Sequence, residues 1–121
     1  MIAGNYNILC EQGTTFTRVI ALEQPTAEDP EVFEPYPLTA HTARMQVRRT
    51  IESTTPIITL TTENGRISID EEDGIITLVI TADDTAELTS SGVYDLEIID
   101  ADGNVSRVIQ GTFTLSLEVT R

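Results

Sequence analysis

Carboxylates are the most frequent side chains in this sequence that could do acid–base chemistry. Four of them, Asp70, Glu71, Glu72 and Asp73, follow one another between two alternating apolar segments. A glycoside hydrolase needs two carboxylates on opposite sides of a cleft, with the pKa of one of them raised. A turn between two strands provides neither condition. We therefore interpret this run as the solvated end of a hairpin, and an acid-pair hydrolase is the least favoured function.

A second acidic group, Asp100-Ala101-Asp102-Gly103-Asn104, has some features of a calcium loop. The helix–loop–helix calcium pattern places its glycine sixth and a bidentate Glu twelfth. Here the glycine is fourth, the twelfth residue is Gly111, and the flanking segments have the pattern of strands. A plain hairpin turn is the favoured interpretation, and a calcium site is the alternative.

Nucleophilic and metal chemistry have few candidate residues. His41 is the only histidine, which removes most Ser–His, Cys–His and His–metal arrangements, and we interpret it as a surface or edge residue. Cys10 is the only cysteine, so no intrachain disulfide forms, and its position in an apolar run predicts a buried free thiol. We predict a protein that is not an enzyme, with no catalytic, cofactor-binding or metal-binding residues.

The charge balance excludes other classes of partner. Seven basic and twenty acidic residues give a formal net charge of −13, which argues against nucleic acid and against anionic membrane surfaces. The charge either keeps the protein dispersed or provides an acidic face that docks a basic partner or binds cations. The sequence has no apolar targeting segment at its start and no run long enough to span a membrane, so we expect synthesis and folding in a cytoplasm.

Alternating apolar residues indicate that strands dominate. In the segment from Ile57 to Ile80, such runs are separated by Asn64-Gly65 and Asp73-Gly74, and Asp102-Gly103 follows later. Asx-Gly pairs between alternating runs are typical of hairpins with type I′ turns. Gly13, between two further runs, predicts another hairpin. The only helical candidate is Asp83–Leu88, started by Thr81 or Ala82.

We therefore predict one all-β domain spanning residues 1–121, an antiparallel Ig-like β-sandwich of about eight strands with one short helical turn. A parallel sheet is excluded because no helical crossover is present. Tyr94 is interpreted as a structural tyrosine whose hydroxyl anchors a loop. The strand phases predict a core of Ile8, Phe16, Ile20, Met45, Val47, Leu60, Ile69, Leu78, Ile80, Leu96, Ile98, Phe113 and Leu115.

Two segments are candidate interfaces. Residues 24–37 hold four prolines and four acids, which excludes a central strand and predicts an extended acidic loop. Val32, Phe33 and Tyr36 are available to pin this loop down, and Phe33 and Tyr36 are its interface candidates. The other segment is the strand over residues 42–48, whose outer face we predict to be basic, with Arg44, Arg48 and Arg49. These arginines either form a cross-strand salt-bridge ladder within the monomer or dock a carboxylate-rich surface of a neighbour.

Several strings resemble small proteins encoded by tailed bacteriophages and prophages: NILCEQGTTFTRVIAL, TARMQVRRT, ITLTTENGRISID and GVYDLEIIDADGNVSRVIQGTFTLSLEVTR. The resemblance covers nearly the whole chain except the acidic loop 24–37, which looks like an insertion. It implies a β-sandwich structural component of the virion, associated with the tail, baseplate or fibre region. It carries over no active-site residues.

From this resemblance we expect a non-enzymatic virion protein, made in the host bacterial cytoplasm and used as a tail, baseplate or fibre adaptor. Its partners would be other virion proteins and copies of itself in a symmetric assembly. A capsid decoration protein is the nearest alternative. A cell-surface carbohydrate-binding module is less favoured, because the chain has no tryptophan and its few aromatic residues fall mostly in phase with the core.

Overall fold

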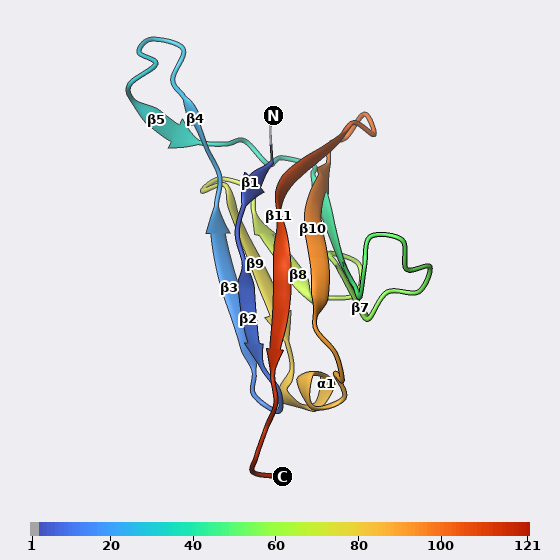
Figure 1. Cartoon of the computed structure of the whole chain (residues 1–121). Helices are drawn as coiled ribbons and strands as arrows, with labels where there is room; N and C mark the ends of the chain where they lie inside the picture. The colour runs from blue at the N-terminus through green and yellow to red at the C-terminus, as the bar shows by residue number, and fades with distance from the viewer. Residues whose placement is uncertain (1–2) are drawn as a thin grey trace.

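The computed structural model describes residues 3–121 and shows an all-β fold of two larger sheets and a small two-stranded ribbon (Figure 1). One sheet contains β1 (Gly4–Asn5), β2 (Ile8–Glu11), β6 (Thr42–Arg48), β7 (Ile58–Thr61), β10 (Gly92–Ile99) and β11 (Val105–Ser116). The other contains β3 (Phe16–Ala21), β8 (Ile67–Asp70) and β9 (Ile75–Ile80). The ribbon consists of β4 (Glu23–Pro25) and β5 (Phe33–Pro35), and the helix α1 is Ala82–Ala86.

The strand order of the six-stranded sheet shows one departure from antiparallel pairing. Its order is β1-β11-β10-β6-β7, and β2 also pairs with β11. Both β1 and β2 run parallel to β11, so the prediction of a purely antiparallel fold is wrong at this edge. Parallel neighbours need a long crossover connection. Here almost the whole chain provides it, because β1 and β2 are the first strands and β11 is the last.

The two larger sheets share one hydrophobic core. Along β6, Ala43, Met45 and Val47 are buried while the intervening residues are more exposed, as a period of two requires. Phe16 of β3 meets Phe113 of β11 across the sheets, with ring centroids 6.3 Å apart. The core prediction is confirmed except at two positions, Ile20 and Ile69, which are partly buried and pack against the core.

Cys10 is buried, as predicted, and burial raises the pKa of its thiol. Among residues 3–121, no helix is long and apolar enough to cross a membrane.

Only two of the four predicted hairpins are present. Asp73-Gly74 joins the antiparallel pair β8–β9, and Asp102-Gly103 joins β10–β11. Asn64-Gly65 instead carries the chain from β7 in one sheet to β8 in the other, and Gly13 lies on a similar crossing from β2 to β3. The hairpin prediction is wrong there because β7 pairs with β6 and β2 pairs with β11.

The type I′ prediction is also wrong. Gly65, Gly74 and Gly103 have positive φ, but the Asx residue before each of them does not. A type I′ turn requires positive φ at both central positions of a two-residue loop. The two hairpin loops are longer than that, at residues 71–74 and 100–104, so one left-handed glycine is sufficient in each.

The helix α1 confirms the predicted helical turn and its start. The Thr81 side chain accepts a hydrogen bond from the Asp84 amide, which caps the first turn, and Asp83 and Asp84 lie at the positive end of the helix. The helix connects β9 of the smaller sheet to β10 of the larger one. It is therefore one of the crossings between the sheets.

Two other crossings are bonded to α1. The buried hydroxyl of Thr85 accepts a hydrogen bond from the Gly13 amide at 3.0 Å and donates one to the Thr14 carbonyl at 2.7 Å, which fixes the β2–β3 crossing. Gln12 adds a bond from its amide to the Leu88 carbonyl at 2.8 Å. Polar contacts thus tie the β2–β3 crossing to α1 and to the residues that follow it.

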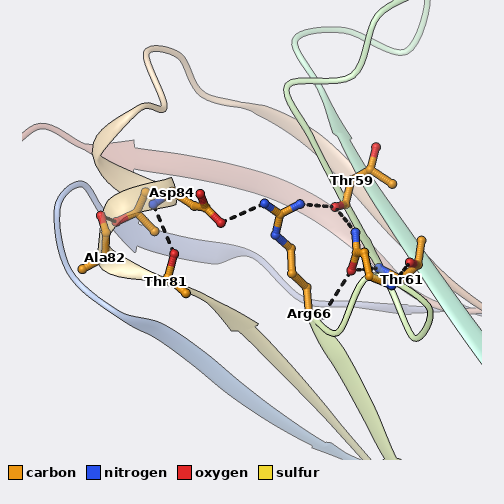
Figure 2. A network of polar contacts seen from close by, with 8 residues as sticks. Thr59, Thr61, Arg66, Thr81, Ala82 and Asp84 are labelled. Atoms are coloured by element: carbon orange, nitrogen blue, oxygen red, sulfur yellow. Dashed lines mark hydrogen bonds and ion pairs between the residues drawn. The ribbon is translucent and has the colours of Figure 1, made fainter.

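The β7–β8 crossing reaches the same helix through Arg66. Figure 2 shows its guanidinium between α1 and β7: Nη2 pairs with the Asp84 carboxylate at 2.8 Å, and Nη1 donates to the Thr59 carbonyl at 3.0 Å. The Asn64 side chain bonds to the Thr61 and Arg66 amides of the turn, each at 3.0 Å. The hydrogen bond from Arg66 lowers the pKa of Asp84.

Tyr94 fixes the parallel edge of the larger sheet. Its hydroxyl donates a hydrogen bond to the carbonyl of Tyr6, which lies at the joint between β1 and β2, so the predicted anchoring role is confirmed. Gly111 is the register partner of Tyr94, and a Cβ there would come within 2.4 Å of that same Tyr6 carbonyl oxygen. The glycine therefore permits the close approach that the tyrosine bond requires.

Residues 24–37 form more than a loop. We expected an extended segment without strands, but β4 and β5 pair with each other, with Pro25 opposite Phe33 and Gln24 opposite Glu34. Proline is tolerated here because a two-stranded ribbon has only edges. We call residues 23–35 the arm. Figure 1 shows it projecting from the end of the body at which β3 finishes.

We expect Thr85→Val to destabilise the fold by about 1–2 kcal/mol, because it keeps the volume but leaves the Gly13 amide and the Thr14 carbonyl without their partner. Thr85→Ser keeps the hydroxyl and serves as the matched variant. Amide hydrogen exchange measured by NMR separates the two: the Gly13 amide should lose its protection in the valine variant only. Equal protection in both variants would show that the hydroxyl does not hold this crossing.

We expect Tyr94→Phe to lower stability near neutral pH and to flatten its decline in alkali. Burial raises the pKa of Tyr94 from 10.0 to about 12. The folded state therefore keeps a proton that the unfolded state releases, so the stabilisation is complete below pH 10 and is lost as pH rises toward 12. Urea unfolding at a series of pH values measures this. The chain has no lysine, so no side-chain amine titrates in this pH range.

Candidate protein interface

The arm exposes apolar side chains that the body does not cover. Phe33 is 57% exposed and Val32 is 51% exposed, so neither pins the segment down as expected. Tyr36, just beyond the arm, is partly buried against the core, and its ring meets the His41 ring edge-on with centroids 6.4 Å apart. Of the two aromatic residues predicted for contacts, Phe33 is the one that remains largely exposed.

The arm is fixed at its base. The Leu22 amide donates to the Gly74 carbonyl at 2.8 Å, and the Tyr36 amide donates to the Leu22 carbonyl at 2.9 Å. Gly74 has φ of 64°, and a Cβ on it would lie 2.8 Å from the carbonyl oxygens of both Leu22 and Tyr36. Glycine at this turn thus lets the root of the arm lie directly on the β8–β9 loop.

The tip of the arm is held by its own hydrogen bonds. The Thr26 amide donates to the Val32 carbonyl at 2.8 Å, and the Thr26 hydroxyl donates to the Asp29 carbonyl at 2.8 Å. The Asp29 carboxylate accepts from the Glu31 amide at 2.9 Å. Hydrogen bonds at the base and at the tip together give the arm a defined shape.

The outward face of the larger sheet carries a groove, which we call the outer groove. One hollow of about 590 Å³ is lined by side chains that include Gln46, Arg48, Ile51, Asp95, Arg107 and Gln110. A second hollow of about 320 Å³ is lined by Arg44, Gln46, Thr59, Thr61, Asp95 and Glu97. The two hollows share Gln46, Asp95 and Glu97, so they form one continuous depression over β6, β10 and their neighbours.

The three predicted arginines have different roles. Arg44 pairs with Glu97 at 2.8 Å, directly across β6 and β10, as in the salt-bridge ladder considered above. Arg48 donates to the Ser53 carbonyl at 2.8 Å and to the Gln46 side chain at 2.7 Å, and it takes part in none of the ion pairs found in residues 3–121. Arg49 is exposed at the start of the loop after β6 and does not line the groove.

Arg107 is a groove residue that the sequence analysis did not identify. It lies 3.4 Å from the Asp95 carboxylate and donates to the Gln110 side chain at 3.0 Å. Arg107 is the register partner of Glu97 because the β10–β11 pairing shifts at this point, from Leu96 opposite Ile109 to Glu97 opposite Arg107. The outward phase of Asp95 and Glu97 was visible in the sequence, but their meeting with Arg44 and Arg107 depends on strand order.

The predicted acidic groups lie apart from the groove. Asp70–Asp73 form the exposed β8–β9 turn, with the Asp70 carboxylate accepting from the Asp73 amide at 3.1 Å. In the described part of the chain no three His, Cys, Asp or Glu side chains are grouped so that they could hold a metal ion. His41 is partly exposed, and its Nδ1 lies 3.0 Å from the Thr39 carbonyl.

Both oxygens of Asp100 are already used within its turn. Oδ1 accepts from the amides of Asp102 and Asn104, each at 2.9 Å, and Oδ2 accepts from the Asn104 side chain at 3.0 Å. These bonds, with those from Asn104 contributing most, lower the pKa of Asp100. The Asp100 carboxylate therefore stabilises the hairpin turn by accepting these hydrogen bonds.

We expect millimolar calcium chloride to leave the thermal unfolding midpoint unchanged, since binding to the folded state alone would raise it. Differential scanning fluorimetry with calcium, and with magnesium as the control divalent cation, checks this. A calcium-specific rise that is absent in Asp100→Asn would contradict our interpretation of the turn.

No protein-family model matches this sequence, and no curated protein matches it significantly. The geometry of the chain presents two surfaces suited to protein contacts, the arm and the outer groove, which lie on different parts of the molecule (Figure 1).

Proposed function

We propose that this chain is a non-enzymatic structural protein of a bacteriophage virion, a component of the tail or baseplate or an adaptor for fibres. In this proposal the two packed sheets form an Ig-like β-sandwich body, and the protein is made in the host bacterial cytoplasm before assembly. The observation that carries the proposal is the arm, a shaped hairpin with exposed Val32 and Phe33 and no covering surface on its own body.

The segments that resemble tailed-phage proteins lie in the body of the fold and not in the arm. The resembling strings contain β2 and β3, β6, β7 and β8, and β10 and β11, which supply most of the core. The segment outside the resemblance is the arm and its root. A shared body with a chain-specific projection is what an adaptor requires, because one fold then fits different neighbours.

The exposed aromatics support a protein contact better than a sugar-binding platform. Phe33 lies on the arm and Tyr6 at the β1–β2 joint, so the two most exposed aromatic side chains belong to different parts of the chain. A carbohydrate module usually stacks sugars on a flat aromatic surface. Val32 and Phe33 are instead exposed next to each other on the arm, and adjoining exposed apolar residues with a polar rim are a feature of protein-interaction sites.

Mass spectrometry of purified particles, isolated tails and emptied heads tests the proposal and separates its alternatives. We expect the chain in the tail fraction at a stoichiometry set by the local symmetry. Recovery in the head fraction alone would favour a capsid decoration protein instead. Absence from every particle fraction would refute a virion role.

Removing residues 27–34 should leave a folded domain that is no longer incorporated into particles, because the root bonds of Leu22, Tyr36 and Gly74 remain while the exposed tip is lost. The double change Arg48→Glu and Arg49→Glu should act in the same way through the other surface. Circular dichroism checks folding, and quantitative mass spectrometry of particles measures incorporation. Val19→Ser, at an exposed apolar position on β3, is the control. Normal copy number in both variants would place the interface elsewhere.

A further inference from the structure

We infer that the arm of one copy docks in the outer groove of a second copy, so that the chain assembles head to tail. This inference deepens the proposed function by naming the partner of both surfaces. It rests on that function only for its place in a particle, because the contact itself needs nothing but two copies of this chain.

The arm is an exposed hairpin whose shape is already fixed at its root and its tip. An isolated two-stranded hairpin is marginally stable in water, and an exposed phenylalanine adds an unfavourable apolar surface. Here the root is bonded to the β8–β9 turn and the tip is closed by Thr26, Asp29 and Val32. The shape is thus formed before binding, which reduces the ordering cost of docking.

The arm is suited to docking through side chains rather than by adding a strand to a neighbouring sheet. Strand addition requires a row of free backbone N–H groups along an edge. Pro25 lies in β4 and Pro35 in β5, so each edge of the ribbon lacks a donor. A groove that receives Val32, Phe33 and the acidic side chains beside them is therefore the fitting receptor, and a bare sheet edge is not.

Charge complementarity favours the outer groove as the receptor for the arm. The arm carries Glu23, Glu28, Asp29, Glu31 and Glu34, and no basic residue lies between Arg18 and Arg44 in the sequence. The groove is lined by three of the chain's seven basic residues, Arg44, Arg48 and Arg107. Two of these pair with Glu97 and Asp95, whereas Arg48 is held in place by neutral groups and keeps donors free for an incoming carboxylate.

The rim of the groove supplies an apolar contact. Ile51, in the loop between β6 and β7, is 83% exposed and lines the larger hollow beside Val93. Burying Phe33 against these two side chains would remove apolar surface from water on both partners. A hollow of about 590 Å³ lies within the usual range for sites that receive side chains or small ligands.

A copy does not fill its own groove. The arm leaves the body where β3 ends and projects away from β6 and β10, over which the groove lies (Figure 1). Contact therefore joins two different patches on two molecules, which is a heterologous interface. Such an interface closes into a ring when the rotation between copies permits and otherwise continues as an open chain.

Complementation between two variants of the full chain tests the inference. The groove variant is Arg48→Glu, with Arg107→Glu in reserve should the first one fold poorly. The arm variant carries Val32→Ser and Phe33→Ser. Arg121→Glu and Val19→Ser are the matched charge and apolar controls, since both lie outside the arm and the groove. Sedimentation equilibrium gives the association state, and circular dichroism verifies folding.

We expect the wild-type chain to self-associate, each variant alone to associate at least tenfold more weakly, and the controls to behave as wild type. Mixing the two variants should restore one contact, the intact arm of the groove variant in the intact groove of the arm variant, and give a heterodimer that grows no further. A mixture no more associated than its components would overturn the inference. So would a wild-type chain that stays monomeric up to about 1 mM, a groove variant that associates normally, or controls that weaken association equally.

These outcomes separate the inference from the proposed function. A chain found in tails whose purified copies do not associate refutes only the arm-to-groove contact. A chain that assembles as described but is absent from every particle fraction refutes only the virion role.

Discussion

The helix α1 is the point on which the connection between the two sheets depends. It is itself the β9–β10 crossing, and the β2–β3 and β7–β8 crossings are bonded to it through Thr85 and Arg66. Apolar packing between sheets is non-directional and would tolerate sliding. Hydrogen bonds with fixed geometry at one end set how the chain passes from sheet to sheet, although the helix buries very little apolar surface of its own.

At the opposite end of the body, a glycine allows a close backbone contact and acidic residues stabilise the turns. Gly74 lets the root of the arm touch the β8–β9 loop, and the Asp70 and Asp100 carboxylates each cap backbone amides of their own turns. Much of the acidic excess is thus concentrated in turns and in the arm, whereas three of the seven arginines line the outward face of the larger sheet. A strongly negative chain can still approach another copy when contacts are local, because charges farther apart than about 8 Å are largely screened at physiological salt.

Local sequence patterns predicted the elements well and their partners poorly. The phases of β6, β9 and β10 were correct because one face of each strand is buried, so that a shift by one residue would expose the whole apolar set. The hairpins assigned to Gly13 and Asn64-Gly65 failed because these turns, although suitable for a tight reversal, carry the chain to the other sheet. Turn residues specify local φ and ψ, and they do not specify which strand the next segment will pair with.

The sequence by itself determined the all-β class, the buried faces, the capped helix, the anchoring role of Tyr94 and the acidic character of residues 24–37. These follow from period, capping chemistry and charge, which act over a few residues. The tertiary structure alone decided the parallel pairing of β1 and β2 with β11, the ribbon within the arm, and the groove that gathers Arg44, Arg48 and Arg107. These features depend on contacts between residues far apart in sequence. Such contacts form only when the strands pair in the folded protein, so local sequence patterns do not predict them.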